Sequence, residues 1–238
     1  MSTETVYKYR NPAVRGEDFR PAKSRLSPVS LAVSAGKCSG CHGANRCVSS
    51  IPNVTTDDKK PDVIITACPI GRNIPAFNSA AARGDRQAAL MIDWADGNLM
   101  PALTGRLCPA SHATSVGSFC QTTCIHSTVY PAHENPEGSV EIGSVEAEMG
   151  EWAIDNNRLP DLNPLNFSTG QSVGYIGAGA ASFLVGAHAI GKGHHFSMYG
   201  SYHKPGGILA REIVGIKFDQ KYLDAYFNHL ADNGGTIH

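Results

Sequence analysis

All seven cysteines of this 238-residue chain lie between residues 38 and 124. They are Cys38, Cys41, Cys47, Cys68, Cys108, Cys120 and Cys124. Thiolates are the ligands that hold zinc and iron-sulfur centres, so a block of cysteines followed by a long cysteine-free stretch is typical of metal ligation. The fold of this block must therefore bring distant segments together, and the mixed short and long spacings favour iron-sulfur clusters.

Three other roles for the cysteines fit less well. No apolar run with a basic start and a small-residue cleavage site is visible in residues 1–31, so no export signal indicates disulfides, and an odd count leaves one thiol over. Structural zinc needs four ligands, and Cys38-x2-Cys41 is a half-site without a second such pair. Buried free cysteines do not explain one Cys-x2-Cys, two Cys-Pro pairs and one Cys-x3-Cys together.

Five strings between residues 37 and 146 are informative in combination. They read KCSGCHGANRC, ACPIGRNIPAFN, GNLMPALTGRLCPA, CQTTC and GSVEIGSVE, in this order. From about Lys37 to Pro160 the chain resembles the amino-terminal iron-sulfur domain shared by the glutamate synthase small subunit, dihydropyrimidine dehydrogenase and the large subunit of the electron-bifurcating ferredoxin:NADP oxidoreductase. The resemblance implies a small helical, ferredoxin-like domain with two 4Fe-4S clusters, whose ligands interleave along the chain.

The resemblance also implies a ligand set for each cluster. One set is Cys38, Cys41, Cys47 and Cys124. The other set is Cys68, Cys108, Cys120 and Glu146, the last at a position where the family has Glu or Gln. Spacing alone would instead make Glu146 a solvated carboxylate of an acidic helix, so its ligand role depends on the resemblance.

Two insertions separate the chain from the family pattern. They lie between Cys47 and Cys68 and between Cys108 and Cys120, and both are rich in Ser, Thr, Asp, Gly and Pro. Surface loops absorb extra length at a small free-energy cost, so we predict loops that bulge outward and leave the ligands in place.

From Gln171 onward the pattern changes to strand, glycine turn, helix and second strand. A glycine turn between a strand and a helix lets the backbone approach a pyrophosphate at the helix N-terminus. The family has its FAD-binding, Rossmann-like domain at this place, and KPGGIL matches its second flavin-contacting turn. The resemblance implies flavin contacts at Gly177, Gly179, Ala181, Gly206 and Gly207.

Two positions depart from this nucleotide-binding pattern. Ser182 replaces the third glycine, which crowds the packing of helix against strand only mildly. Gly200 stands where the second strand should end in an acidic residue that hydrogen-bonds the ribose. Loss of that bond weakens binding by roughly tenfold to a hundredfold, so we expect FAD to bind weakly or only in a complex.

These observations predict an α+β chain in three parts. They are an extended N-terminal arm at 1–36, a helical domain with two 4Fe-4S clusters at 37–165, and a partial Rossmann-like domain of the FAD-binding type at 170–238. The last part is expected to be one strand-helix-strand unit and a further helix, truncated within the FAD domain. Because a parallel sheet is normally covered on both faces, we expect a partner chain to supply the rest, or the half-domain to be a docking surface.

The functional prediction is an iron-sulfur electron-transfer subunit of a multisubunit cytoplasmic oxidoreductase, which relays electrons between the redox centres of its partners. No catalytic residues are predicted in the chain itself. With 20 Lys and Arg against 21 Asp and Glu, and no apolar run of membrane-spanning length, neither nucleic acid nor a membrane span is expected.

Two alternatives remain open. In the first, a partner chain completes a split flavoprotein that reacts with NAD(P)H and communicates with ferredoxin or another subunit. In the second, the Rossmann remnant is a scaffold that positions the clusters and binds no nucleotide. The weakened flavin contacts favour electron transfer or the scaffold, and the retained glycine turns favour the split flavoprotein.

Overall fold

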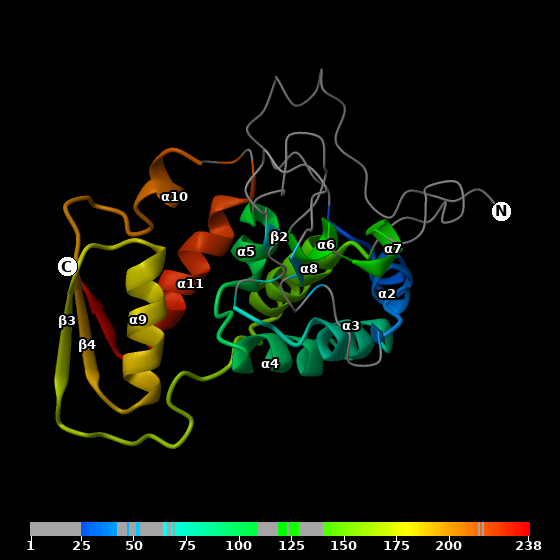
Figure 1. The fold of residues 1–238 in the computed structure, drawn as a ribbon. Helices are drawn as coiled ribbons and strands as arrows, with labels where there is room; N and C mark the ends of the chain where they lie inside the picture. The colour runs from blue at the N-terminus through cyan, green and yellow to red at the C-terminus, as the bar shows by residue number, and fades with distance from the viewer. Residues whose placement is uncertain are drawn as a thin grey trace. The chain divides into compact units, whose positions relative to one another are not determined.

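A computed structural model describes residues 25–41, 47, 51–52, 64–65, 68, 70–108, 119–122, 124–128, 140–213, 215 and 217–238. The described chain divides into two compact units, 25–150 and 151–238 (Figure 1). Residues 1–24, which belong to the predicted arm, lie outside the described residues. The two units are described separately below.

Unit 1 is built from helices. They are α2 (Pro28–Gly36), α3 (Ile74–Ala82), α4 (Arg86–Ala95), α5 (Pro101–Leu107), α6 (Phe119–Thr122), α7 (Ile125–Thr128) and the first part of α8 (Ile142–Asp155). Polar side chains at three N-caps satisfy backbone N–H groups that have no partner within the helix: Ser27 caps α2, Asn73 caps α3 and Asp85 caps α4. Residues 28–36, which the sequence analysis assigned to the extended arm, form α2, because Ser27 and Pro28 provide a helix start.

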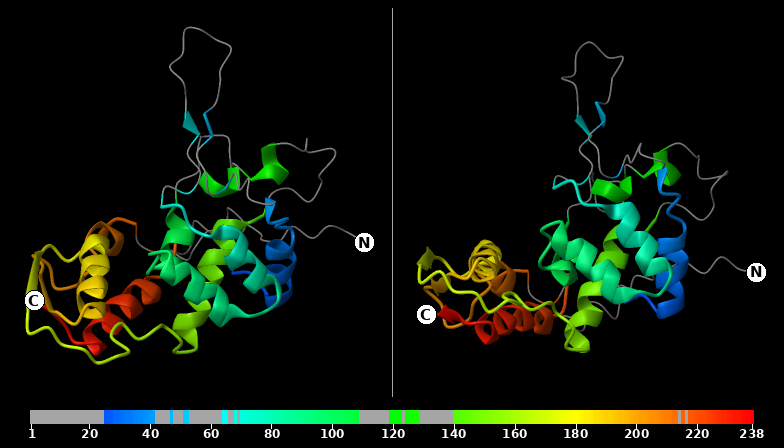
Figure 2. Two further views of the ribbon diagram at one scale, coloured as in Figure 1. Left: turned by 60° about the horizontal axis from the view of Figure 1, so that its bottom comes forward. Right: turned by 90° about the horizontal axis from the view of Figure 1, so that it is seen from below.

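The core of unit 1 lies where α2, α3, α4 and α8 meet. Its largest fully buried side chains include Leu31, Ile74, Phe77, Leu90 and Met149. The views in Figure 2 show α2, in blue, beside α3, and α4 follows α3 after a three-residue turn. Each helix is short, so the stability of this unit depends on the shared apolar core more than on any single helix.

Helices α5 and α8 approach one another at backbone distance. A Cβ added to Gly150 would lie 2.2 Å from the backbone nitrogen of Ala102, and one added to Gly105 would lie 2.4 Å from the carbonyl oxygen of Gly143. Both glycines are therefore required by the packing. The close contact fixes which residues of α5 face which residues of α8.

The predicted first insertion contains a short antiparallel pair, β1 (Ile51–Pro52) with β2 (Ile64–Ile65). Most of this insertion, and all of the second insertion before Phe119, lie outside the described residues. The prediction of outward loops without loss of ligands therefore stays a prediction.

Unit 2 contains a three-stranded parallel sheet in the order β3-β4-β5. Its elements are β3 (Ser172–Ile176), α9 (Ala180–Gly191), β4 (His195–Tyr199), α10 (Ile208–Arg211), α11 (Gln220–Asp232) and β5 (Gly235–Ile237). The third strand, β5, was not predicted, because three residues are too few to show a strand pattern. The strand, glycine turn, helix and second strand are all present as predicted.

Helices α9 and α11 pack together against the sheet (Figures 1 and 2). The ring of Phe183 on α9 makes edge contacts with Tyr226 and Phe227 on α11. Gly186 brings α9 close to β4, since an added Cβ would lie 2.5 Å from the ring of Phe196. In β3, by contrast, Ile176 is 86% exposed, so the apolar surface of this edge strand is incompletely covered in the described chain.

Helices and a small parallel sheet together confirm the predicted α+β class. Among the described residues, no helix has both the length and the apolar character needed to cross a membrane.

Candidate functional site

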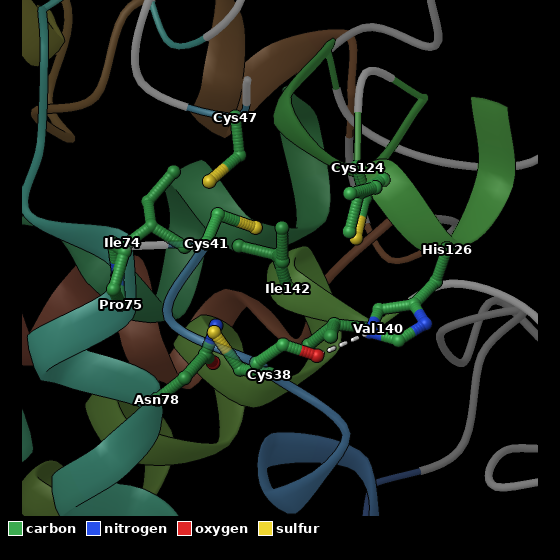
Figure 3. A pocket seen from close by; sticks show the side chains of 12 residues that line it. Cys38, Cys41, Cys47, Ile74, Pro75, Asn78, Cys124, His126, Val140 and Ile142 are labelled. Atoms are coloured by element: carbon green, nitrogen blue, oxygen red, sulfur yellow. Dashed lines mark hydrogen bonds between the residues drawn. The ribbon is translucent and has the colours of Figure 1, made fainter. Parts of the chain in front are cut away.

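Four of the seven cysteines line one pocket in unit 1 (Figure 3). They are Cys38, Cys41, Cys47 and Cys124, the set expected for the first cluster. The remaining lining residues are Ser39, Ile74, Pro75, Asn78, Ile125, His126, Val140 and Ile142. The fold therefore gathers these thiols from segments that are far apart in the sequence.

Local backbone structure places each thiol at the end of a helix or in a turn. Cys38 follows α2, and its N–H donates to the carbonyl of Ala35. Gly40 and Cys41 both adopt positive φ, +68° and +45°, so the chain reverses sharply between the first two thiols. Cys124 lies between α6 and α7, where its N–H donates to the carbonyl of Gln121.

A side-chain contact holds the rim of the pocket together. The hydroxyl of Ser34 on α2 accepts a hydrogen bond of 3.0 Å from the N–H of Glu141, directly between the lining residues Val140 and Ile142. Across the pocket, Ser39 Oγ lies 3.0 Å from His126 Nε2 (Figure 3). These contacts join the segments that carry Cys38 and Cys124.

The thiols influence one another electrostatically. Burial, together with smaller contributions from the neighbouring Cys124, Cys38 and Cys41, raises the pKa of the Cys47 thiol to about 12. A thiol that resists deprotonation in this way needs a cationic centre nearby to become a thiolate. An iron-sulfur centre has the required charge and takes four thiolate ligands, so the donor set of this pocket fits such a centre.

The pocket wall is mainly apolar. Ile74, Val140 and Ile142 are each at most 1% exposed.

Among the described residues, no three His, Cys, Asp or Glu side chains converge on a point where they could bind one metal ion.

Glu146 on α8 is buried, with only 3% of its surface exposed. The alternative that it is a solvated carboxylate is therefore wrong. Its Oε2 accepts a hydrogen bond of 2.6 Å from Nη1 of Arg72, and its Oε1 accepts from Nδ2 of Asn98 at 2.8 Å and from the hydroxyl of Thr104. Three donors thus hold this carboxylate in one orientation.

A second buried carboxylate completes this network. Asp93 on α4 pairs with Nη2 of Arg72 and accepts a hydrogen bond of 3.0 Å from Asn98. Burial raises the pKa of Asp93 well above its ordinary value, and the charge of Glu146 adds to this effect. Burial opposes the charge of Arg72, but Glu146 and Asp93 outweigh it and raise the pKa of the guanidinium, with a smaller contribution from Cys68.

The three cysteines of the second predicted set lie on separate segments. Cys68 donates its N–H to the carbonyl of Cys47, which joins the two predicted sets through the backbone. Cys108 follows the last turn of α5, and Cys120 is buried in α6. The role of these three thiols and of Glu146 as one ligand set stays a prediction.

In unit 2, the two predicted glycine turns are in contact. Gly177 has φ +116°, and Gly179 is the N-cap of α9. The N–H of Gly206 donates to the carbonyl of Ala178 at 2.6 Å, and a Cβ added to Gly207 would lie 3.4 Å from Cα of Gly179. Ala181 lies in the first turn of α9. The backbone of the two turns is thus in direct contact.

The two departures from the nucleotide-binding pattern have structural consequences. The hydroxyl of Ser182 is buried and donates to the carbonyl of Gly179 at 2.6 Å, so this residue is accommodated without exposed polar surface. A Cβ added to Gly200 would lie 2.9 Å from Cβ of Ala178. An acidic residue at position 200 would therefore require the glycine turn to shift.

Sequence reasoning missed the polar residues around the predicted ligands. Arg72, Asp93, Asn98 and Thr104 were not singled out, although Arg72 follows Cys68 within four residues. Asn78 was missed as well. It is a polar residue at a position of α3 where the helical pattern, one turn after Ile74, predicts an apolar one, and this mismatch is the signal that could have identified it.

One protein family has a sequence model that matches residues 15–158, more than half of the chain. Its description is dihydropyrimidine dehydrogenase domain II, 4Fe-4S cluster. The match includes all seven cysteines and Glu146.

Three relatives are similar over nearly the whole chain. The glutamate synthase (NADPH) small chain of Azospirillum brasilense is 28% identical over 96% of this chain and 41% of its own length. The corresponding small chain of Bacillus subtilis is 24% identical over 94% of this chain and 40% of its own length. The glutamate synthase (NADH) of Schizosaccharomyces pombe is 27% identical over 95% of this chain and 9% of its own length. The chain thus spans about two fifths of the small chains that it matches.

Proposed function

Since the chain belongs to the dihydropyrimidine dehydrogenase domain II, 4Fe-4S cluster family, which confirms the resemblance inferred from its sequence, we propose that it relays electrons within a larger oxidoreductase. In this proposal, two 4Fe-4S clusters conduct electrons between the redox centres of partner subunits in the cytoplasm. Substrate chemistry belongs to the partners, and this chain contributes no catalytic residue.

One observation carries the proposal: Cys38, Cys41, Cys47 and Cys124 line the same pocket. Four thiolates around an apolar pocket suit an iron-sulfur centre, because burial from water and the surrounding hydrogen bonds set the potential at which such a centre accepts an electron. The buried side chains of Ile74, Val140 and Ile142 make the wall of this pocket apolar, and the bond between Ser39 and His126 joins two of the thiol-bearing segments.

For the second cluster we propose Cys68, Cys108, Cys120 and Glu146 as the ligands. Glu146 is supported by its burial and by Arg72, which bonds its carboxylate and also interacts electrostatically with Cys68. A carboxylate is a harder donor than a thiolate, so a centre that binds it should differ in potential from one bound by four thiolates.

Iron and sulfide analysis of the full chain, purified without oxygen, tests the proposal. Two 4Fe-4S clusters correspond to about eight irons and about eight sulfides per chain. Stoichiometric zinc without iron would contradict the proposal, and about four irons would restrict it to one cluster.

A second candidate function is a split flavoprotein, in which a partner completes a Rossmann-like FAD site and the assembly reacts with NAD(P)H. It is favoured by the contact between the turns at Gly177 to Gly179 and at Gly206 to Gly207, since glycine turns of this kind let a backbone approach a pyrophosphate. We expect FAD to be weakly bound or absent in the chain alone, because Gly200 lacks the carboxylate that holds the ribose.

The crowding at Gly200 gives this candidate a specific test. We expect Gly200→Glu alone to bind FAD no better than the natural sequence, because its Cβ meets Ala178. The double variant Gly200→Glu with Ala178→Gly should bind about tenfold more tightly, through the restored hydrogen bond to ribose. Equal affinities for all three chains, measured by flavin fluorescence, would argue for the scaffold without nucleotide.

A further inference from the structure

Asn78 is a buried amide that lines the thiol pocket. It lies on α3, its side chain is 0% exposed, and Figure 3 shows it on the side of the pocket where Cys38 lies. Within the described part of the chain, neither its Nδ2 nor its Oδ1 has a hydrogen-bond partner. A fully buried amide without partners is strongly unfavourable, so a partner in the pocket is expected.

The surroundings of Asn78 limit what this partner can be. Its helical neighbours at the pocket, Ile74 and Pro75, present apolar side chains. The polar lining residues Ser39 and His126 lie within hydrogen-bond distance of each other. Besides Ser39 and His126, the described lining residues with polar side-chain atoms are the four cysteines, whose sulfur atoms accept hydrogen bonds when they are thiolates.

We propose that the side-chain amide of Asn78 donates an N–H···S hydrogen bond to the iron-sulfur centre in this pocket, and that this bond raises the reduction potential of that centre. The inference rests on the proposed function, because it assigns a role to Asn78 at the site of the first cluster. In this proposal Asn78 contacts the centre through a hydrogen bond and is not one of the iron ligands.

The direction of the effect follows from charge. A centre that accepts one electron becomes more negative, and an N–H group directed at its sulfur atoms stabilises the more negative state. Loss of the donor should therefore make reduction harder. Because the hydrogen bond exists in both redox states, only the difference in its strength between the two states changes the reduction potential.

Asn78→Leu tests this role, since leucine has nearly the same size and no donor. In the full chain, purified without oxygen, we expect the ratio of reduced to oxidised first cluster at a fixed potential to fall about tenfold. For a one-electron couple this is a decrease of about 59 mV in reduction potential. A redox titration followed by electron paramagnetic resonance measures both clusters, and the second should be unchanged.

Ala81→Gly is the matched control. Ala81 lies on the same helix and is also fully buried, but it does not line the pocket and makes no hydrogen bond through its side chain. It should alter the packing of α3 and leave both potentials unchanged. Equal potentials in Asn78→Leu and the natural sequence, with full iron content, would overturn the inference and leave the proposed function intact.

A second measurement covers the case in which Asn78→Leu fails to assemble the centre. Pulsed electron paramagnetic resonance of the natural chain, labelled with 15N at asparagine, should show a nitrogen coupling to the reduced first cluster. Absence of this coupling would overturn the inference even if the variant is unstable. A natural chain without any iron-sulfur signal would instead overturn the proposed function, and this inference with it.

Discussion

The two units of this chain build their candidate sites in opposite ways. In unit 1, side chains from distant segments converge. Cys38 and Cys124 line one pocket, and Arg72 bonds Glu146, which is 74 residues later in the sequence. In unit 2, the candidate site is backbone from two glycine turns, at 177–179 and 206–207, that donate and accept hydrogen bonds directly. A site made of converging side chains depends on the whole fold, whereas a site made of backbone depends on a few local conformations.

This difference predicts where each unit is vulnerable. The polar groups of unit 1 are buried and need their partners, because an unpaired buried charge is strongly destabilising. The turns of unit 2 need small residues and little else. Four experiments test the contrast.

The largest effect is expected from Gly150→Ala. The added methyl group would meet the backbone of Ala102 at 2.2 Å, and backbone atoms cannot rotate away. We expect a loss of about 3 kcal/mol or more in the free energy of unfolding, measured by denaturant titration. Gly179→Ala in unit 2 is the control, since nothing lies within 4 Å of its added Cβ and its φ is −104°, so its effect should stay within about 0.5 kcal/mol. Equal effects of the two variants would remove the contrast.

Cys124→Ser should halve the iron content. Serine keeps the size of the side chain but removes one of four thiolates, so the first cluster should be lost while the second remains, which leaves about four irons per chain. Iron analysis and electron paramagnetic resonance measure this result. Loss of all iron would show that the two centres assemble together, and unchanged iron would exclude Cys124 as a ligand.

Glu146→Ala should change the resonance signal of one cluster and spare the other. It also removes one of the two carboxylate partners of Arg72 while Asp93 remains, so we expect a loss of about 1 to 3 kcal/mol in the free energy of unfolding. Glu146→Cys places a thiolate at this position. Its signal should differ from those of the natural chain and of Glu146→Ala.

Asp93→Asn is the control for the role of Glu146. It disturbs the same buried network through Arg72 and Asn98 but leaves the Glu146 carboxylate in place. Its resonance spectrum should match that of the natural chain. If Asp93→Asn and Glu146→Ala change the spectrum in the same way, Glu146 acts through the network and not as a ligand.

The smallest expected effect is the dependence of the stability of unit 2 on pH. The Nε2–H of His229 donates to the carbonyl of Pro160, and burial lowers the pKa of this imidazole below its usual 6.5. Below pH 6.5 the unfolded chain takes up a proton that the folded chain resists, so the stability of unit 2 should fall as the pH falls through this range. Unfolding measured between pH 7.5 and 5.5 should show a weaker dependence in His229→Gln. His188→Gln, an exposed histidine of α9, is the control.

Local features of the fold were predictable from the sequence, and distant contacts were not. The strand, glycine turn and helix around Gly177 were recognised because each signal lies within a few residues. The close approach of α5 to α8 was not, because Gly105 and Gly150 show no sign in the sequence that they face backbone. The helix at 28–36 was missed although Ser27 and Pro28 are typical of a helix start.

The candidate site likewise contains residues that could be predicted from the sequence and contacts that could not. Its thiols were found through their spacing and a family resemblance, and one predicted set of four does line a single pocket. The burial of Glu146 was not predictable, because its acidic surroundings at Glu141, Glu148 and Glu151 are typical of a solvated helix. Only the fold shows that Arg72 and Asn98 satisfy this carboxylate.

The pocket shared by Cys38 and Cys124 also has a consequence for biosynthesis. Ser39 and His126, which bond across this pocket, are 87 residues apart in the chain. A ribosome adds about 5 to 20 residues per second, so roughly 4 to 17 seconds pass between the appearance of the first and last thiols. During this interval the early thiols are on a nascent chain without a finished pocket. If this pocket holds an iron-sulfur centre as proposed, the centre can be completed only after the carboxyl-terminal wall of the pocket has been made, and the early thiols must stay reduced until then.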